Sequence, residues 1–112
     1  MTPLQQTALD FCRECLGWEK ASIFAVLGCI GNGKLPGNPS FDYTDLNAVM
    51  EAVRGWCVRN KLGFTICCDE SGFEVAVFSA GFEEIDEEAT NQNLCHALLA
   101  ACVAASRNLK TA

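Results

Sequence analysis

The stretch FTICCDESGFEVAVFS, residues 64–79, decides the fold class. Two runs rich in β-branched and aromatic residues, 64–68 and 73–79, are separated by the turn-forming residues DESG, so we predict a β-hairpin. One face of the second run is wholly apolar: Phe73, Val75 and Val77. The opposite face is only partly apolar, because it carries Glu74. The apolar face needs another layer to cover it.

Three helices are predicted to provide that layer. The apolar residues of 4–16 and 46–57 recur at spacings of three and four, which is the period of one helix face. Residues 92–107 are apolar around most of the helix circumference, so this helix should be largely buried. The expected N-caps are Thr2, Thr44 and either Thr90 or Asn91. The glycines expected to end the first two helices are Gly17 and Gly63.

The segment between the first two predicted helices is harder to assign. Residues 23–30 are short and apolar, which predicts a further strand. Residues 31–40 hold three glycines and two prolines, which predict a loop. The order of elements in these 112 residues predicts one domain, 1–112, of the α+β class: a small antiparallel sheet packed with three helices.

The segment GCIGNGK, residues 28–34, has the Gly-x-x-x-x-Gly-Lys spacing of a P-loop. A P-loop also needs a Ser or Thr after the lysine and a helix that begins there, whereas this chain has Leu35 and Pro36. We therefore predict a loop and not a nucleotide-hydrolysing site, and two alternatives stay open: a plain loop, or a loop that contacts a ligand phosphate without hydrolysing it. Its contact residues are Gly31, Gly33 and Lys34.

Aromatic side chains in or beside the predicted loops are candidates for a contact surface. These residues are Trp18, Phe41 and Tyr43. Trp56 differs, because it falls on the apolar stripe of the second helix and is expected in the core.

Acidic residues are concentrated at 83–88, EEIDEE. The acids of this cluster are Glu83, Glu84, Asp86, Glu87 and Glu88. They account for most of the net charge of −6, because the rest of the chain holds nine acids and eight bases. A general nucleic-acid-binding protein needs a basic surface, so direct nucleic-acid binding is not expected. The cluster matches no calcium loop, and it is either a solvated run before the third helix or a docking patch for a basic partner.

Eight cysteines would suggest disulfides in a secreted protein, but the N-terminal residues do not read as an export signal. We therefore expect reduced thiols in a cytoplasm. Cys12 and Cys15 have a spacing used by zinc sites and redox dithiols, but they lie on the apolar face of a predicted helix without a second ligand pair. They are predicted to be buried hydrophobes, with a zinc or redox protein as an alternative.

No arrangement of residues predicts catalysis, a metal or a cofactor. Cys67 and Cys68 are adjacent in a strand, so their side chains point to opposite faces. His96 is the single histidine, and its side chain would point about 100° away from that of Cys95 on a helix. No apolar run reaches the ~18 residues that span a membrane. We expect neither an enzyme nor a membrane protein.

Several stretches together resemble a known family. They are LGW at 16–18, PSFDYTDLNAVMEAV at 39–53, the hairpin, and ATNQNLCHALLAACVAA at 89–105. In this order they are similar to small phage proteins described as the phage ABA sandwich domain. The resemblance implies a layered α/β/α sandwich and a phage or prophage origin. It supplies no catalytic residues, and it does not cover residues 20–38.

The leading hypothesis is a non-enzymatic, phage-encoded accessory protein that binds a host protein and inhibits a bacterial defence system, in the manner of an anti-CRISPR protein. It would act in the cytoplasm of the bacterial host. The alternative is a small-ligand module that sequesters a nucleotide-like immune signal. That alternative requires basic residues to converge: Lys34, Arg54, Arg59 and Lys61. A homo-oligomer is also expected, because a second copy could cover the partly apolar face of the hairpin.

Overall fold

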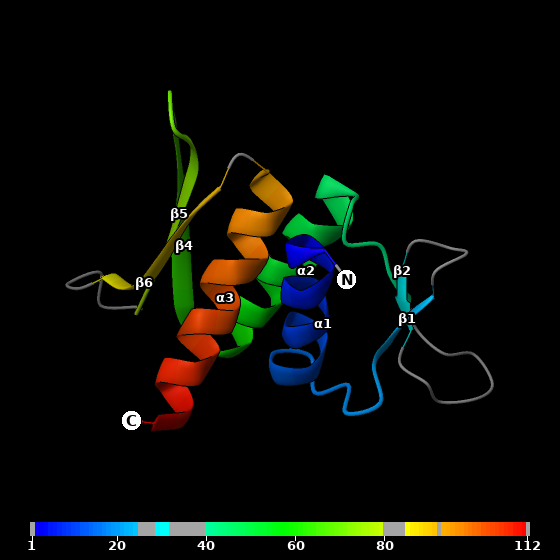
Figure 1. Cartoon of the computed structure of the whole chain (residues 1–112). Helices are drawn as coiled ribbons and strands as arrows, with labels where there is room; N and C mark the ends of the chain where they lie inside the picture. The colour runs from blue at the N-terminus through cyan, green and yellow to red at the C-terminus, as the bar shows by residue number, and fades with distance from the viewer. Residues whose placement is uncertain (1, 25–28, 32–39, 80–84, 92, 112) are drawn as a thin grey trace.

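The computed structural model describes residues 2–24, 29–31, 40–79, 85–91 and 93–111 (Figure 1). Its helices are α1 (Pro3–Glu14), α2 (Leu46–Arg59) and α3 (Leu94–Thr111). The strands of a small sheet are β1 (Ser22–Phe24), β2 (Cys29–Gly31) and β3 (Ser40–Phe41). The strands of a larger sheet are β4 (Leu62–Asp69), β5 (Gly72–Ser79) and β6 (Ile85–Asn91). All strand pairs described are antiparallel, which confirms the predicted α+β class.

The layers have a different order from the α/β/α sandwich that the resemblance implies. Helices α2 and α3 contact the β4–β5–β6 sheet, α1 packs on α3 on the side away from that sheet, and the small sheet lies beyond α1 (Figure 1). The three helices therefore lie on the same side of the larger sheet. The other face of the β4–β5 hairpin exposes Thr65, Cys67 and Glu74 to solvent, and it also carries Ala76 and Phe78.

The predicted hairpin is confirmed and is longer than expected. Strands β4 and β5 pair from Leu62 with Ser79 to Asp69 with Gly72. The side chains of Val75 and Val77 have no exposed surface, as the alternation of the sequence predicted for the apolar face.

The sequence prediction missed three strands. The range 23–30 overlaps two strands, β1 and β2, and its residues 25–28 lie outside the described part of the chain. Strand β3 begins at Ser40, the last residue of the predicted loop. The acidic segment contributes Ile85–Asn91 to β6, which pairs with β5 and shifts register between Val77 and Phe78. Pairing with an existing strand overrides a charge pattern that is typical of a loop.

The helix ends follow local hydrogen bonds that sequence spacing predicted only in part. Thr2 caps α1 as expected: its hydroxyl accepts a hydrogen bond from the Gln5 amide at 3.2 Å. Asp45, not Thr44, caps α2, because the hydroxyl of Thr44 donates to Asp42 at 2.6 Å. The side chain of Asn93 accepts from the first turn of α3, whereas the expected caps Thr90 and Asn91 belong to β6.

Of the two glycines expected to end α1 and α2, only the first has that role. Gly17 follows α1 with a φ of 73°, as a helix-ending glycine should. The corresponding position after α2 is Lys61, with a φ of 58°, and Gly63 lies inside β4 instead. An added Cβ at Gly63 would lie 2.8 Å from a ring carbon of Phe78, so this glycine allows the aromatic ring to cover the strand.

Helix α3 forms the centre of the core. The residues of α3 without exposed surface are Ala97, Leu98, Leu99, Ala101 and Cys102. The helix contacts α1, α2, β5 and β6, which explains why its apolar residues surround most of its circumference. The prediction of a largely buried third helix is therefore confirmed.

Candidate functional site

The aromatic residues predicted to form a contact surface lie mostly in the core. Phe41 and Tyr43 are each 5% exposed. The ring of Phe41 stacks on Phe11 with centroids 5.8 Å apart, and the Tyr43 hydroxyl accepts a hydrogen bond from Gln5. Trp18 is half-buried against the core. The expectation was wrong for Phe41 and Tyr43, because short connections can be covered by neighbouring helices.

The predicted phosphate loop and acidic patch are described only in part. Gly31 is buried at the end of β2, while Gly33 and Lys34 lie outside the described residues. Glu83 and Glu84 also lie outside them. The other acids of the patch, Asp86, Glu87 and Glu88, belong to β6. The acidic patch and the phosphate loop therefore stay predictions.

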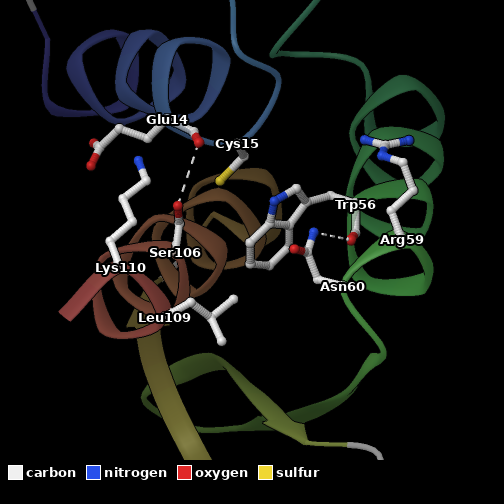
Figure 2. Close-up of a pocket in the computed structure, with 8 residues that line it drawn as sticks. All are labelled: Glu14, Cys15, Trp56, Arg59, Asn60, Ser106, Leu109 and Lys110. Carbon is white, nitrogen blue, oxygen red and sulfur yellow. Dashed lines mark hydrogen bonds between the residues drawn. The ribbon is translucent and has the colours of Figure 1, made fainter. Parts of the chain in front are cut away.

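A pocket of about 250 Å³ lies where the C-terminal ends of the three helices converge (Figure 2). Helix α1 and the residue after it contribute Glu14 and Cys15. The contributions of α2 and its C-cap are Trp56, Arg59 and Asn60. Those of α3 are Ser106, Leu109 and Lys110. The pocket forms because the three helices run in the same direction and all end near it (Figure 1).

Charges at the pocket give a locally basic surface on an acidic protein. Arg107 binds the carboxylate of Glu14 through two nitrogens, at 3.0 and 2.9 Å, and lies 3.5 Å from Asp10. The carboxylate of Glu14 raises the pKa of Arg107. Within the described part of the chain, Arg59 and Lys110 form no ion pair. The pocket lining therefore holds two bases, Arg59 and Lys110, and one acid, Glu14, while the whole chain carries −6.

Polar groups in the pocket wall are partly used by internal hydrogen bonds. The hydroxyl of Ser106 donates a hydrogen bond to the backbone carbonyl oxygen of Glu14 at 3.4 Å. The side-chain amide of Asn60 donates one to the backbone carbonyl oxygen of Trp56 at 2.8 Å. Each of these bonds occupies one carbonyl oxygen in the last turn of its helix, Glu14 in α1 and Trp56 in α2. The indole of Trp56 forms an apolar wall beside them (Figure 2). The arrangement combines an apolar surface with two cations, Arg59 and Lys110, that form no ion pair with any residue the structure describes.

The sequence did not predict this basic site, and it named converging bases only as a requirement of the small-ligand alternative. Of the basic residues required to converge, Arg59 lines the pocket, Arg54 and Lys61 do not, and Lys34 is outside the described residues. Lys110 was missed, although a base in the last turn of a helix is a recognised sequence signal. The convergence of three helix ends is a tertiary property that spacing along the chain does not reveal.

The cysteine beside the pocket is not an activated nucleophile. Burial raises the pKa of Cys15 to about 12, and it raises that of Cys12 to about 12 as well. The thiols of Cys57 and Cys102 share a hydrogen bond. It lowers the pKa of Cys57 and raises the pKa of Cys102. All eight cysteines are free. The prediction that Cys12 is a buried hydrophobe is confirmed by its 0% exposure.

Thiol reactivity should follow this difference in burial. With iodoacetamide at pH 8, we expect Cys67 and Cys68 to react first, because both are exposed. Alkylation of Cys12 and Cys15 should be at least about a hundredfold slower, since the thiolate is the reactive form and burial suppresses it. Peptide mass spectrometry over a time course measures the rates, and denatured protein, in which all cysteines should react alike, is the control. Equal rates at Cys12 and Cys67 in the folded protein would contradict the structure.

The histidine lies at the other end of α3 from the pocket. Its Nε2 is 3.0 Å from the hydroxyl of Thr7, which makes it a bridge between α1 and α3. Among the described residues, no group of three or more His, Cys, Asp or Glu side chains is placed to hold a metal ion. No helix in that part of the chain has the length and apolar character needed to cross a membrane.

No protein-family model matches the chain, and no curated protein or solved structure matches it either. The resemblance to the phage ABA sandwich domain therefore stays a prediction that rests on the sequence motifs quoted above.

Proposed function

We propose that this chain is a non-enzymatic binding protein and that the pocket at the helix ends receives an acidic group of its partner. One observation carries the proposal: Arg59 and Lys110, which have no ion-pair partner among the described residues, border a pocket with the indole of Trp56 as an apolar wall. An acidic group beside an apolar surface, such as a carboxylate on a peptide, complements both features.

The size of the pocket supports a protein partner over a free nucleotide. Pockets that enclose a small ligand typically measure about 300–1,000 Å³, and this one measures about 250 Å³. A carboxylate side chain of a partner fits such a volume, whereas an intact nucleotide would extend well outside it. The raised pKa of Cys15 also supports binding rather than catalysis, because an uncharged thiol is a poor nucleophile.

Within this proposal, the biological role follows from the sequence resemblance. The chain is proposed to be a phage-encoded accessory protein that acts in the cytoplasm of a bacterial host and blocks a defence system by occupying one of its protein surfaces. The resemblance of its sequence motifs to those of phage proteins supports this role.

The test compares the double variant Arg59→Glu/Lys110→Glu with Arg54→Glu, a matched control on the exposed side of α2 outside the pocket. Each protein is used as bait in an extract of infected bacteria, and the captured proteins are quantified by mass spectrometry. The partner is the protein whose recovery falls at least about tenfold with the double variant, because like charges now face its acidic group, and stays unchanged with the control.

Two results would overturn the proposal. One is a partner that is recovered equally well by the double variant and by the wild-type chain. The other is calorimetric binding of a cyclic or ADP-ribose-type nucleotide that the double variant abolishes, which would replace the protein partner with a small ligand. Circular dichroism of both variants confirms that they are folded.

A further inference from the structure

Strand β4 lies at one edge of the larger sheet. In the described part of the chain it pairs with β5 on one side and with no strand on the other (Figure 1). Natural proteins protect such edges with charged residues, proline or bulges. The middle of β4, Thr65–Cys68, has none of these, and all four of its residues are exposed. The opposite edge of the sheet, β6, includes three acids in its sequence and a register shift.

We infer that β4 pairs with β4 of a second copy of this chain in antiparallel orientation, about a two-fold axis at Thr65. The two three-stranded sheets would then form one continuous sheet of about six strands. Residues directly opposite each other in an antiparallel pair lie on the same face of the sheet. The two-fold axis therefore passes through one residue and not between two neighbouring residues. We place it at Thr65.

This register continues the helix-facing apolar row across the dimer. Phe64 lies opposite Ile66 of the second copy, and Leu62 lies opposite its Cys68. Ile66 is 37% exposed in the single chain, so pairing would cover apolar surface that is now in water. Gly63 and Cys67 face each other on the outer side of the sheet, where the ring of Phe78 packs over Gly63.

Charge complementarity selects this register. Lys61 precedes β4, and Asp69 ends it, so an axis at Thr65 places Lys61 of each copy beside Asp69 of the other. An axis at Ile66 would place Lys61 opposite Ser71 and Asp69 opposite Gly63, which loses the charge pair. An axis at Phe64 would leave Asp69 beyond the start of the opposite strand.

The dimer is independent of the proposed pocket, because no residue of β4 lines it. Loss of partner binding in the Arg59 and Lys110 variant and loss of self-association in a β4 variant are therefore distinguishable results.

The experiment uses two substitutions at the axis, Thr65→Glu and Thr65→Lys. Thr65 is exposed, so neither change disturbs the core. Each variant alone places two like charges opposite each other, and its dimer dissociation constant should rise about tenfold or more. An equal mixture of the two variants should recover dimers, because each dimer now carries one charge of each sign across the axis. Sedimentation velocity measures the association, and native mass spectrometry identifies the mixed dimers by mass.

Two controls check the register. Glu74→Lys changes an exposed charge on the same face of the sheet but on β5, so the dimer should be unaffected. Lys61→Glu should weaken the dimer, and adding Asp69→Asn should restore part of it, since that change removes the repulsion and keeps a side chain that can accept the Ser71 hydrogen bonds.

Three results would overturn the inference. The first is a wild-type chain that stays monomeric at about 100 µM. The others are a dimer that neither Thr65 variant weakens, and a mixture of those variants that forms no mixed dimers. Capture of a different protein by the wild-type edge, blocked by both Thr65 variants while the chain remains monomeric, would assign β4 to a partner strand instead.

Discussion

Replacing Phe11 with alanine is expected to lower the free energy of unfolding by about 3–5 kcal/mol. Phe11 has no exposed surface, and its ring stacks on Phe41. The substitution removes the side chain that joins α1 to the small sheet, and it leaves a cavity that rigid helices cannot fill. Since small domains are stable by about 5–15 kcal/mol, a large part of the total stability depends on the burial of this one side chain.

Urea unfolding monitored by circular dichroism measures the effect. The control is Phe11→Leu, which keeps an apolar side chain of moderate size and should lose much less stability. A second control, Phe73→Ala, removes a ring that is only half-buried. If Phe11→Ala were no more harmful than Phe73→Ala, the stacking of α1 on the small sheet would not contribute to the fold as the structure requires.

Enlarging Ala101 to leucine is expected to destabilise the protein by about 1–3 kcal/mol. Ala101 is fully buried in α3, which is packed on one side by α1 and on another by the larger sheet. Leucine and alanine have similar helix propensities, so intrinsic propensity alone predicts almost no change in stability. A loss of stability would therefore report close packing around α3.

Ala104→Leu is the matched control, because Ala104 lies on the same helix and is half-buried. We expect its effect on the urea midpoint to be clearly smaller than that of Ala101→Leu. Equal midpoints for the two variants would mean that α3 is not enclosed, and the central position assigned to this helix would be wrong.

Strong periodic patterns made most of the fold predictable. The alternation at 73–79 identified the apolar face of the hairpin, and the helical spacing identified all three helices. Element ends were less predictable, because a cap depends on which side chain reaches a free amide. Asp45 has this role where Thr44 was expected, and Asn93 has it where either Thr90 or Asn91 was expected.

The candidate site was much less predictable than the fold. Phe41 and Tyr43 looked like loop residues in the sequence, but they are covered by α1 and its neighbours. Lys110 looked like an ordinary terminal base, yet it borders the pocket together with Arg59. In both cases the relevant neighbours are distant in the chain, so no local pattern contains the information.

The sequence by itself determined the α+β class, the hairpin, the three helices and the buried character of the third, because these depend on hydrophobic periodicity over short ranges. Only the tertiary structure decided that the acidic segment pairs as β6, that the helices lie on one side of the larger sheet, and that their C-terminal ends meet around a basic pocket. The physical reason is that strand pairing and helix convergence depend on long-range packing, where burial of one surface decides which others stay exposed.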